Sequence, residues 1–326
     1  MSLRAPDKAT HDPSVAIIIL NWNGLNDTLV CLQSVSNIRY NALEIIVVDN
    51  GSSDGSIETI HKTFPGVQVI ANTSNLGFAE GNNVGIRRAL TDTDYILLLN
   101  NDTTVHPDLL HHLIPVVEKD PSIAVAGPVI CYDEEPDTIW CAGLQMGQGR
   151  MFGMSIAQTT SVLMYCGQPA HMVPNDIYSV DAIVGCAMLM RTSVLHEIGL
   201  LASELFMIHE DFDWSLRTQK AGYRCVVVPV VNVWHKVSAS IKRQDQQRSG
   251  NPSAEYYWYR NWLLVMRKHY GVRTMLMIAA LYAFKLFPSL FYQDIVQRRF
   301  IPSVWVAHWL ALLDALAGRH KKRFIR

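Results

Sequence analysis

The sequence lacks several features that would assign it to a familiar class. It has no G-x-G-x-x-G turn and no G-x4-G-K-[S/T] loop, so a dinucleotide dehydrogenase and a P-loop nucleotidase lack their fingerprints. It also has no G-x-S-x-G nucleophile elbow. The six cysteines form no C-x-x-C pair, which disfavours a zinc site. Several lie in apolar runs, and a reduced cytosolic compartment fits them best.

Charged residues are also scarce. They make up 17% of the 326 residues, and the mean hydropathy is +0.10. The net charge of −1 indicates no particular partner, and we predict no nucleic-acid partner. Residues 260–326, however, carry 12 Lys or Arg and two Asp or Glu, a net of +10, whereas the preceding residues have a net charge of −11. This asymmetry predicts an acidic body and a basic tail for an anionic surface.

Long apolar runs are missing as well. Lys285 and Pro288 interrupt the apolar stretch that begins at residue 275, so no run reaches the roughly 18 residues of a membrane span. Residues 1–13 are polar, which predicts a flexible tail and no signal peptide.

Residues 256–326 are predicted to form a helical, basic and amphipathic region. Trp305, Trp309, Leu313 and Leu316 recur at helical spacing, and the basic end HKKRFIR follows them. Such a helix is typical of the surface of an anionic membrane. An ordinary core helix with a solvated basic end is the alternative. We therefore expect a cytoplasmic protein that is peripheral at the inner face of the plasma membrane.

The chain does contain a regular alternation of apolar runs and helical segments. Strands are expected at 15–21, 43–50, 67–72 and 95–102, and helices at 25–35, 57–64, 77–90 and 107–118. The alternation predicts an α/β fold with a mostly parallel, Rossmann-like sheet and helices on both faces. Further strands are expected at 122–130, 182–191 and 225–235, with a helix at 206–222.

Polar residues gather where the predicted strands end, which is where open α/β sheets bind ligands. An exposed Asp49 could accept from a nucleobase N–H or a ribose hydroxyl, although an Asx-rich turn would also explain it. Asp102 could hold Mg²⁺ or Mn²⁺, or simply end a strand before the next helix. His235 also ends a strand and could be a metal ligand, although a lone His is more often structural.

Three acidic residues crowd the segment HEDFDWSLR. A helix N-terminus would offset part of their repulsion, and Asp213 can pair with Arg217 four residues later. Glu210 and Asp211 are left without a structural reason. One of them could therefore act as a general base.

Taken in chain order, these segments resemble the family 2 glycosyltransferases of the GT-A fold, and among them bacterial rhamnosyltransferases and related cell-surface polysaccharide enzymes. The resemblance covers about residues 14–270. Its pieces are VAIIILNWNG, LEIIVVDNGSSDGS, NTSNLGFAEGNNVGI, LLLNNDTTV, DAIVGCAMLMR, HEDFDWSLR and YYWYRNWLL.

The resemblance implies roles for individual residues. Asn100-Asn101-Asp102 stands at the family's D-x-D position, so Asp102 would be the carboxylate ligand of the cation and His235 a second ligand. Asp211, beside Glu210, would be the catalytic base. The residues implied at the nucleotide site are Asn21, Asp49, Ser52, Gly77, Asn82, Asn100 and Asn101. Those implied in the sugar or acceptor pocket are Gly185, Asp213 and Arg217.

The resemblance also implies an organisation and an activity. A catalytic domain would span 14–255, with a nucleotide-binding half at 14–120 and an acceptor-binding half at 121–255, and the loop 236–253 would close over the donor. The expected activity is inverting, metal-dependent transfer of a sugar from a nucleoside diphosphate, dTDP-rhamnose before a UDP-sugar, to a glycan or lipid-linked acceptor in cell-surface polysaccharide synthesis. The alternatives are a sugar-nucleotide nucleotidylyltransferase and an inactive nucleotide-binding scaffold.

Overall fold

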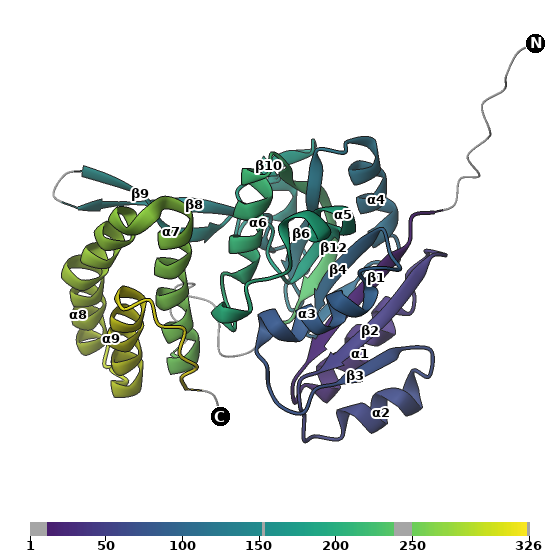
Figure 1. Ribbon diagram of the computed structural model, residues 1–326, viewed down its shortest axis with the longest axis horizontal. Coiled ribbons are helices and arrows are strands. Elements are labelled where there is room, and N and C mark those ends of the chain that lie inside the picture. The colour runs from purple at the N-terminus through teal and green to yellow at the C-terminus, as the bar shows by residue number, and fades with distance from the viewer. Residues whose placement is uncertain (1–11, 152–153, 238–249, 325–326) are drawn as a thin grey trace, which may run out of the picture.

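A large sheet forms the middle layer of the protein in a computed structural model that describes residues 12–151, 154–237 and 250–324. Its strands are β1 (Val15–Asn21), β2 (Leu43–Asp49), β3 (Gln68–Ala71), β4 (Tyr95–Asn100), β5 (Thr103–Val105), β6 (Ile123–Tyr132), β7 (Ile139–Cys141), β10 (Tyr178–Val180), β11 (Ala187–Arg191) and β12 (Arg224–His235). In the described residues the strand order is β10-β12-β6-β11-β4-β1-β2-β3, with β5 added to β12 and β7 to β6 (Figure 1).

The long strands run in one direction. β1 pairs in parallel with β2 and β4, β2 with β3, and β6 with β12, whereas β11 runs antiparallel between β4 and β6. Ile17, Ile18 and Ile19 are all fully buried, as expected for a strand that is covered on both faces. The prediction of a mostly parallel sheet is confirmed.

Helices cover both faces of this sheet. They are α1 (Leu25–Val35), α2 (Ser56–Thr63), α3 (Phe78–Ala89), α4 (Leu109–Lys119), α5 (Thr192–Ile198) and α6 (Glu210–Lys220). Side chains of α1, α2 and α4 share a core with Ile17 and Ile19, whereas those of α3, α5 and α6 share a core with Ile18. The two cores lie on opposite faces because successive strand side chains alternate.

The C-terminal part is helical and lies at one end of the sheet layer, beside a hairpin of β8 (Leu144–Met151) and β9 (Met154–Leu163) (Figure 1). It contains α7 (Pro252–Leu281), a π-helical turn (Tyr282–Leu286), α8 (Phe287–Val296) and α9 (Pro302–Leu316). One hydrophobic core joins Phe212 of α6, Trp262 of α7 and Trp305 of α9. The helical region therefore packs directly onto the sheet layer.

Two predicted elements begin later than expected. The strand expected from residue 182 starts at Ala187, so Gly185 and Cys186 lie in the turn before it. The helix expected from 206 starts at Glu210, because Phe206 and His209 have positive φ angles that a right-handed helix excludes.

The expectation that no segment could span a membrane is wrong by length and composition. The helical stretch Pro252–Val296, which is kinked at Gly271 (φ +89°), is long and apolar enough, because it continues through Lys285 and through Pro288, which stands in the first turn of α8. In the apolar window of this helix, 39% of the residues are buried inside the protein. The predicted tail and the loop 236–253 lie mostly outside the described residues, and α7 begins four residues before the predicted boundary at 256.

Candidate active site

A cleft of about 840 Å³ opens at the carboxyl ends of β1, β2 and β4. Four of the residues predicted for the site line it, namely Gly77, Asn100, Asn101 and Asp102. The opposite wall comes from residues far along the chain, at 251–254 before and within α7, with Ser303 and Phe324. The C-terminal helical region thus forms part of the cleft.

Asp102 and His235 meet at this edge of the sheet. The distance between Asp102 Oδ1 and His235 Nε2 is 3.0 Å, and the antiparallel pairing of β5 with β12 sets it by placing Thr103 opposite His235. Burial would raise the pKa of Asp102, but the hydrogen bond with His235 and the charge of that imidazole lower it below its usual value. The sheet therefore joins two residues that are 133 positions apart.

The chemistry of this pair suits a divalent cation. Mg²⁺ and Mn²⁺ take carboxylate oxygens such as those of Asp102, and they complete their shells with phosphate and water. Within the part of the chain that the structure describes, no group of three or more His, Cys, Asp or Glu side chains gathers as a metal cluster. Asp102 and His235 would therefore hold a cation together with a diphosphate.

Asn21 and Asp49 organise the loops behind the cleft and do not line it. Both side chains are fully buried. Asn21 Nδ2 donates to Asp49 Oδ2 at 2.8 Å, and the backbone N–H of Ser52 donates to Asp49 Oδ1 at 2.8 Å. The expectation of an exposed carboxylate at Asp49 is wrong, because both of its oxygens accept hydrogen bonds within the protein. Contacts of these three residues with a nucleotide stay a prediction.

The three other asparagines of the predicted set differ in their surroundings. Asn82 is buried, donates to Phe78 O within α3 and does not line the cleft. Asn101 lines the cleft and donates to Thr28 Oγ1 at 3.0 Å. The buried amide oxygen of Asn100, which also lines the cleft, has no hydrogen-bond partner among the described residues. It could accept from a ligand.

Gly77 lets the start of α3 approach the segment before α6. Its φ is +88°, and a Cβ there would lie 2.5 Å from both Phe206 Cδ2 and Phe206 O. The N–H of Ala79 donates to the same carbonyl at 3.1 Å. The nucleotide side of the cleft is thus joined to the segment that leads to Asp211.

Asp211 lies beside the cleft and does not line it. The N–H of Gly185 donates to Asp211 Oδ2 at 2.8 Å. A Cβ on Gly185 would lie 3.3 Å from the ring of Phe78, a residue of the cleft wall, and 3.6 Å from the Cβ of Asp211. Gly185, which was predicted for the sugar or acceptor pocket, is therefore closely packed between Phe78 and Asp211.

Burial shifts the pKa values of two neighbouring carboxyl groups, Glu210 and Asp211, in the same direction. It raises the pKa of Asp211. It raises the pKa of Glu210 well above the usual value, and the charge of Asp211 adds to this. A carboxylate with a raised pKa is a stronger base, so Asp211 has the electrostatic property that a general base needs.

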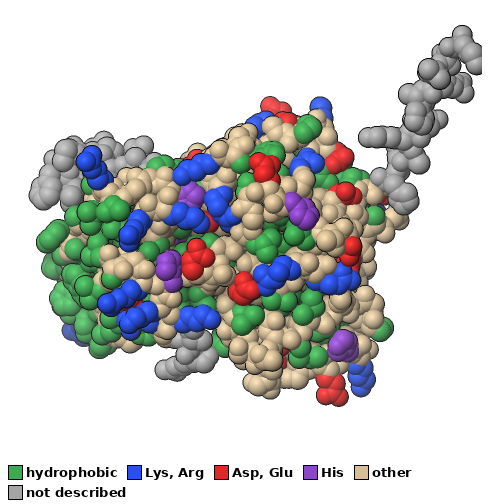
Figure 2. All heavy atoms as spheres, viewed as in Figure 1, with side chains coloured by type: hydrophobic (Ala, Val, Ile, Leu, Met, Phe, Trp, Pro, Cys, Tyr) green, Lys and Arg blue, Asp and Glu red, His purple; other side chains and the backbone are tan. Residues whose placement is uncertain are grey.

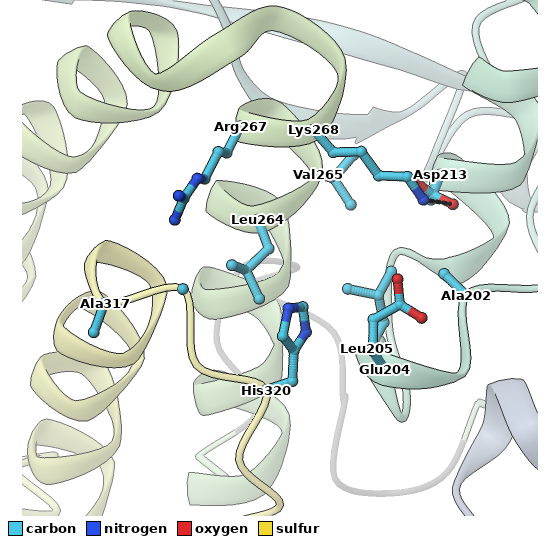
Figure 3. Close-up of a pocket in the computed structure, with 11 residues that line it drawn as sticks. Ala202, Glu204, Leu205, Asp213, Leu264, Val265, Arg267, Lys268, Ala317 and His320 are labelled. Carbon is cyan, nitrogen blue, oxygen red and sulfur yellow. Dashed lines mark hydrogen bonds and ion pairs between the residues drawn. The ribbon is translucent and has the colours of Figure 1, made fainter.

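Asp213 and Arg217, which were predicted for the sugar or acceptor pocket, do not line this cleft, and a contact with a sugar or acceptor stays a prediction. The Asp213 side chain is fully buried and meets Arg217 Nε at 3.0 Å, Lys268 Nζ at 2.9 Å and His269 Nε2 at 2.8 Å. It borders a separate hollow of about 520 Å³, where Lys268 points toward it (Figure 3). Although burial would raise the pKa of Asp213, these partners lower it to about 2. Asp213 therefore joins α6 to α7 through Lys268 and His269.

Sequence reasoning missed Trp22, Asn50 and Phe78, which line the cleft. Asn50 Nδ2 donates to Asn75 Oδ1 and to Gly77 O, each at 3.1 Å, and so shapes the rim. Its position directly after Asp49 at a strand end was a usable signal. Trp22 is 43% exposed beside the buried Asn21, and an exposed aromatic at a strand end could have been singled out.

The sheet, the cleft at its carboxyl ends and the Asp102–His235 pair define a GT-A type α/β fold. A mannosyltransferase from Pyrobaculum calidifontis, solved with GDP-Man and Mn²⁺, matches with a TM-score of 0.56 at 15% identity over 95% of this chain and 88% of that chain. GalNAc-T7, solved with UDP, GalNAc and Mn²⁺, matches with a TM-score of 0.59 at 17% identity over 78% of this chain and 48% of that one. The predicted fold is confirmed.

The model of glycosyl transferase family 2 matches residues 16–199, and the chain belongs to this family. An N-acetylglucosaminyl-diphospho-decaprenol L-rhamnosyltransferase of Mycobacterium tuberculosis is 24% identical over 75% of this chain and 88% of its own length. An uncharacterized protein of Sinorhizobium fredii is 27% identical over 77% of this chain, which spans only 28% of that protein.

Proposed function

We propose that the protein is an inverting, metal-dependent transferase that moves a sugar from a nucleoside-diphosphate donor to a hydroxyl group of a glycan or lipid-linked acceptor in cell-surface polysaccharide synthesis. dTDP-rhamnose is the favoured donor, on the likeness to the rhamnosyltransferase, and a UDP-sugar is the alternative. The observation that carries the proposal is the 3.0 Å contact of Asp102 with His235 at the edge of the nucleotide-sized cleft.

The residues divide the work of the reaction. Asp102 and His235 would hold Mg²⁺ or Mn²⁺, which would neutralise the charge that develops on the leaving diphosphate. Asp211 accepts the proton of the acceptor hydroxyl as its oxygen forms a bond to the anomeric carbon. The bond from that carbon to the diphosphate oxygen breaks, and the electron pair leaves with the diphosphate. A single displacement of this kind inverts the anomeric centre.

Exposed apolar side chains support a peripheral contact with an anionic membrane. Among the described residues, 14 of the 19 exposed large hydrophobic side chains belong to residues 272–316. They include Phe284, Tyr292 and Leu313, and Figure 2 shows hydrophobic side chains gathered over the end of the molecule that holds α8 and α9. The net charge of +10 in residues 260–326 complements anionic lipid headgroups.

A thermal-shift series tests the donor and the cation. The protein is heated with dTDP, UDP, GDP or NAD, each with and without Mn²⁺. A ligand that binds only the folded state raises the melting temperature. We expect a rise with dTDP or UDP that depends on Mn²⁺, followed by sugar transfer from the matching donor. The proposal would be contradicted if only NAD raised the melting temperature, or if none of the nucleotides raised it. Nucleotide binding without any sugar transfer would favour the inactive scaffold.

A further inference from the structure

The backbone that leads to Asp211 is held in a conformation that residues with side chains rarely adopt. Phe206, Ile208 and His209 have φ angles of 69°, 68° and 71°. Ile208 is β-branched, and such residues tolerate this region least. A backbone of this kind persists only where its surroundings over-determine it. The contacts of the 205–209 segment must therefore supply this constraint.

The main contact is one side chain of α7. Asn261 is fully buried, and its Nδ2 lies 2.9 Å from Leu205 O, 2.7 Å from Met207 O and 2.8 Å from Ile208 O. A side-chain amide carries two donor hydrogens for these three carbonyls, so at least one hydrogen is shared between two carbonyls. A single amide thus satisfies three carbonyls of the left-handed turn.

The neighbouring residue orients that amide. Arg260 is also fully buried, and its Nε donates to Asn261 Oδ1 at 2.8 Å. This bond occupies the amide oxygen, so the NH₂ end faces the turn. Arg260 Nη2 also donates to Leu205 O at 2.9 Å, and the guanidinium carbon lies 4.7 Å from the centre of the Tyr257 ring. The whole arrangement comes from one buried stretch of α7.

Two tryptophans of α7 enclose the end of the segment. The ring of His209 lies 4.8 Å from that of Trp258 and 5.0 Å from that of Trp262, measured between centroids. Trp262 also lies 5.0 Å from Phe212, which directly follows Asp211. The helix α7 therefore contacts the chain on both sides of the candidate base.

We propose that Asn261, oriented by Arg260, is a positioning residue for the base. It fixes the 205–209 segment, three of whose residues have positive φ angles, so that α6 begins at Glu210 and the Asp211 carboxylate meets the N–H of Gly185. The inference rests on the proposed function, because Asp211 is a base only if the protein catalyses transfer to a hydroxyl group.

The structure predicts which kinetic constant depends on Asn261. Phe206 has its own partners on the nucleotide side, since its carbonyl accepts from Ala79 and its ring packs against Gly77. Removal of the amide should therefore displace Asp211 and leave the nucleotide rim in place. A misplacement of about 1 Å is enough to cost on the order of 100-fold in rate.

Two substitutions separate hydrogen bonding from packing. Asn261→Ala removes the donors, and Asn261→Asp keeps the shape but places a carboxylate oxygen against the three carbonyls. We expect kcat to fall by about 10- to 100-fold in Asn261→Ala while KM for the donor changes by less than about threefold. Asn261→Asp should lose at least as much. If Asn261→Asp is more active than Asn261→Ala, packing explains the effect and the proposal is overturned.

A matched control disturbs a buried contact of α7 that does not involve residues 205–209. His308→Gln alters a buried 2.9 Å contact between α9 and Glu255 of α7 that does not touch residues 205–209. It should lower stability but keep kcat. If Asn261→Ala does not fold, Arg260→Lys is the milder substitution, because it removes the Nε donor that orients the amide, and it should lower kcat in the same direction.

Hydrogen exchange makes the test independent of activity. The amides of residues 205–213 should exchange faster in Asn261→Ala than in wild type and His308→Gln. Unchanged exchange, or faster exchange with unchanged kcat, would overturn the inference. If wild type transfers no sugar from any donor, the proposed function fails and the base-positioning role fails with it, whereas exchange still shows whether Asn261 holds the segment.

Discussion

The neighbouring acidic residues Glu210, Asp211 and Asp213 have opposite electrostatic surroundings. Burial raises the pKa of both Asp211 and Glu210, and among the described residues no cationic side chain forms an ion pair with either carboxyl group. Asp213, two residues later, is surrounded by Arg217, Lys268 and His269, and its pKa falls to about 2. The three carboxyl groups thus divide into a candidate base, its buried neighbour and a structural ion-pair centre.

Asp211→Asn should lower kcat by about 1,000-fold and leave nucleotide affinity nearly unchanged, because an amide cannot accept the hydroxyl proton. Because burial raises the pKa of Asp211 above 3.8, the rate of wild type should fall on acidification with a midpoint above pH 3.8. Steady-state transfer rates against pH and a nucleotide titration measure both.

Glu210→Gln is the matched comparison for the base. Burial raises the pKa of Glu210 well above its usual value and so favours its neutral form, and an amide of the same shape should therefore reduce kcat far less than Asp211→Asn does. Equal losses in the two variants, or unchanged turnover in Asp211→Asn, would reject the assignment of the base.

Asp213→Asn should destabilise the protein by about 2 kcal/mol at pH 7, since a drop of nearly two pKa units corresponds to that much differential stabilisation. The folded pKa lies below the unfolded value of 3.8, so this stability is present above pH 4 and is lost as the pH falls toward 2. Urea unfolding at pH 7 and at pH 3 measures the difference. A variant equally destabilised at both pH values would contradict the ion-pair explanation.

At the scale of elements, the site depends on close approaches between segments that are distant in sequence. The start of α3 touches the 205–209 segment, and β5 lies against the end of β12. Gly77 makes the first approach possible, because its backbone conformation and the adjacent Phe206 both exclude a side chain.

Gly77→Ala should lower the free energy of unfolding by about 2 to 4 kcal/mol and weaken nucleotide binding, because it adds a steric clash to backbone strain. Gly55→Ala is the control, since Gly55 has a φ of +79° and no atom within 4 Å of the new Cβ. It should cost only about 1 to 2 kcal/mol and leave binding unchanged. Urea unfolding and a nucleotide titration of both variants check this, and similar losses in both would show that the contact with Phe206 does not matter.

At the scale of the whole molecule, the C-terminal helices have two faces. One face shares a core with α6 and forms part of the cleft wall, whereas the other exposes apolar side chains beside a basic tail. This arrangement would place the cleft near a membrane surface on which a lipid-linked acceptor lies.

Leu313→Glu should reduce binding to anionic vesicles by about 10-fold or more, because it puts a charge on the proposed membrane face. Val30→Glu is the control, since Val30 is 58% exposed on α1 and Leu313 is 59% exposed on α9. Sedimentation with vesicles of anionic and of neutral lipid measures both. Equal binding by wild type and Leu313→Glu would contradict the membrane face.

The sequence by itself determined the layered fold and most of the cleft edge. Apolar β-branched runs alternate with helices, and polar residues at strand ends predict a ligand site because parallel strands bring their carboxyl ends together. Asp102 and His235 were predicted as a pair from resemblance, and the pairing of β5 with β12 supplies the contact. Gly77, Asn100 and Asn101 likewise line the cleft.

Only the tertiary structure decided the burial of Asp49, the contacts of Asp213 with Lys268 and His269, and the contacts of Asn261. Each depends on partners that lie more than 25 residues away or on another element, and local patterns contain no information about such partners. The late start of α6 has the same cause, since α7 holds the preceding turn in a conformation that the segment's own propensities disfavour.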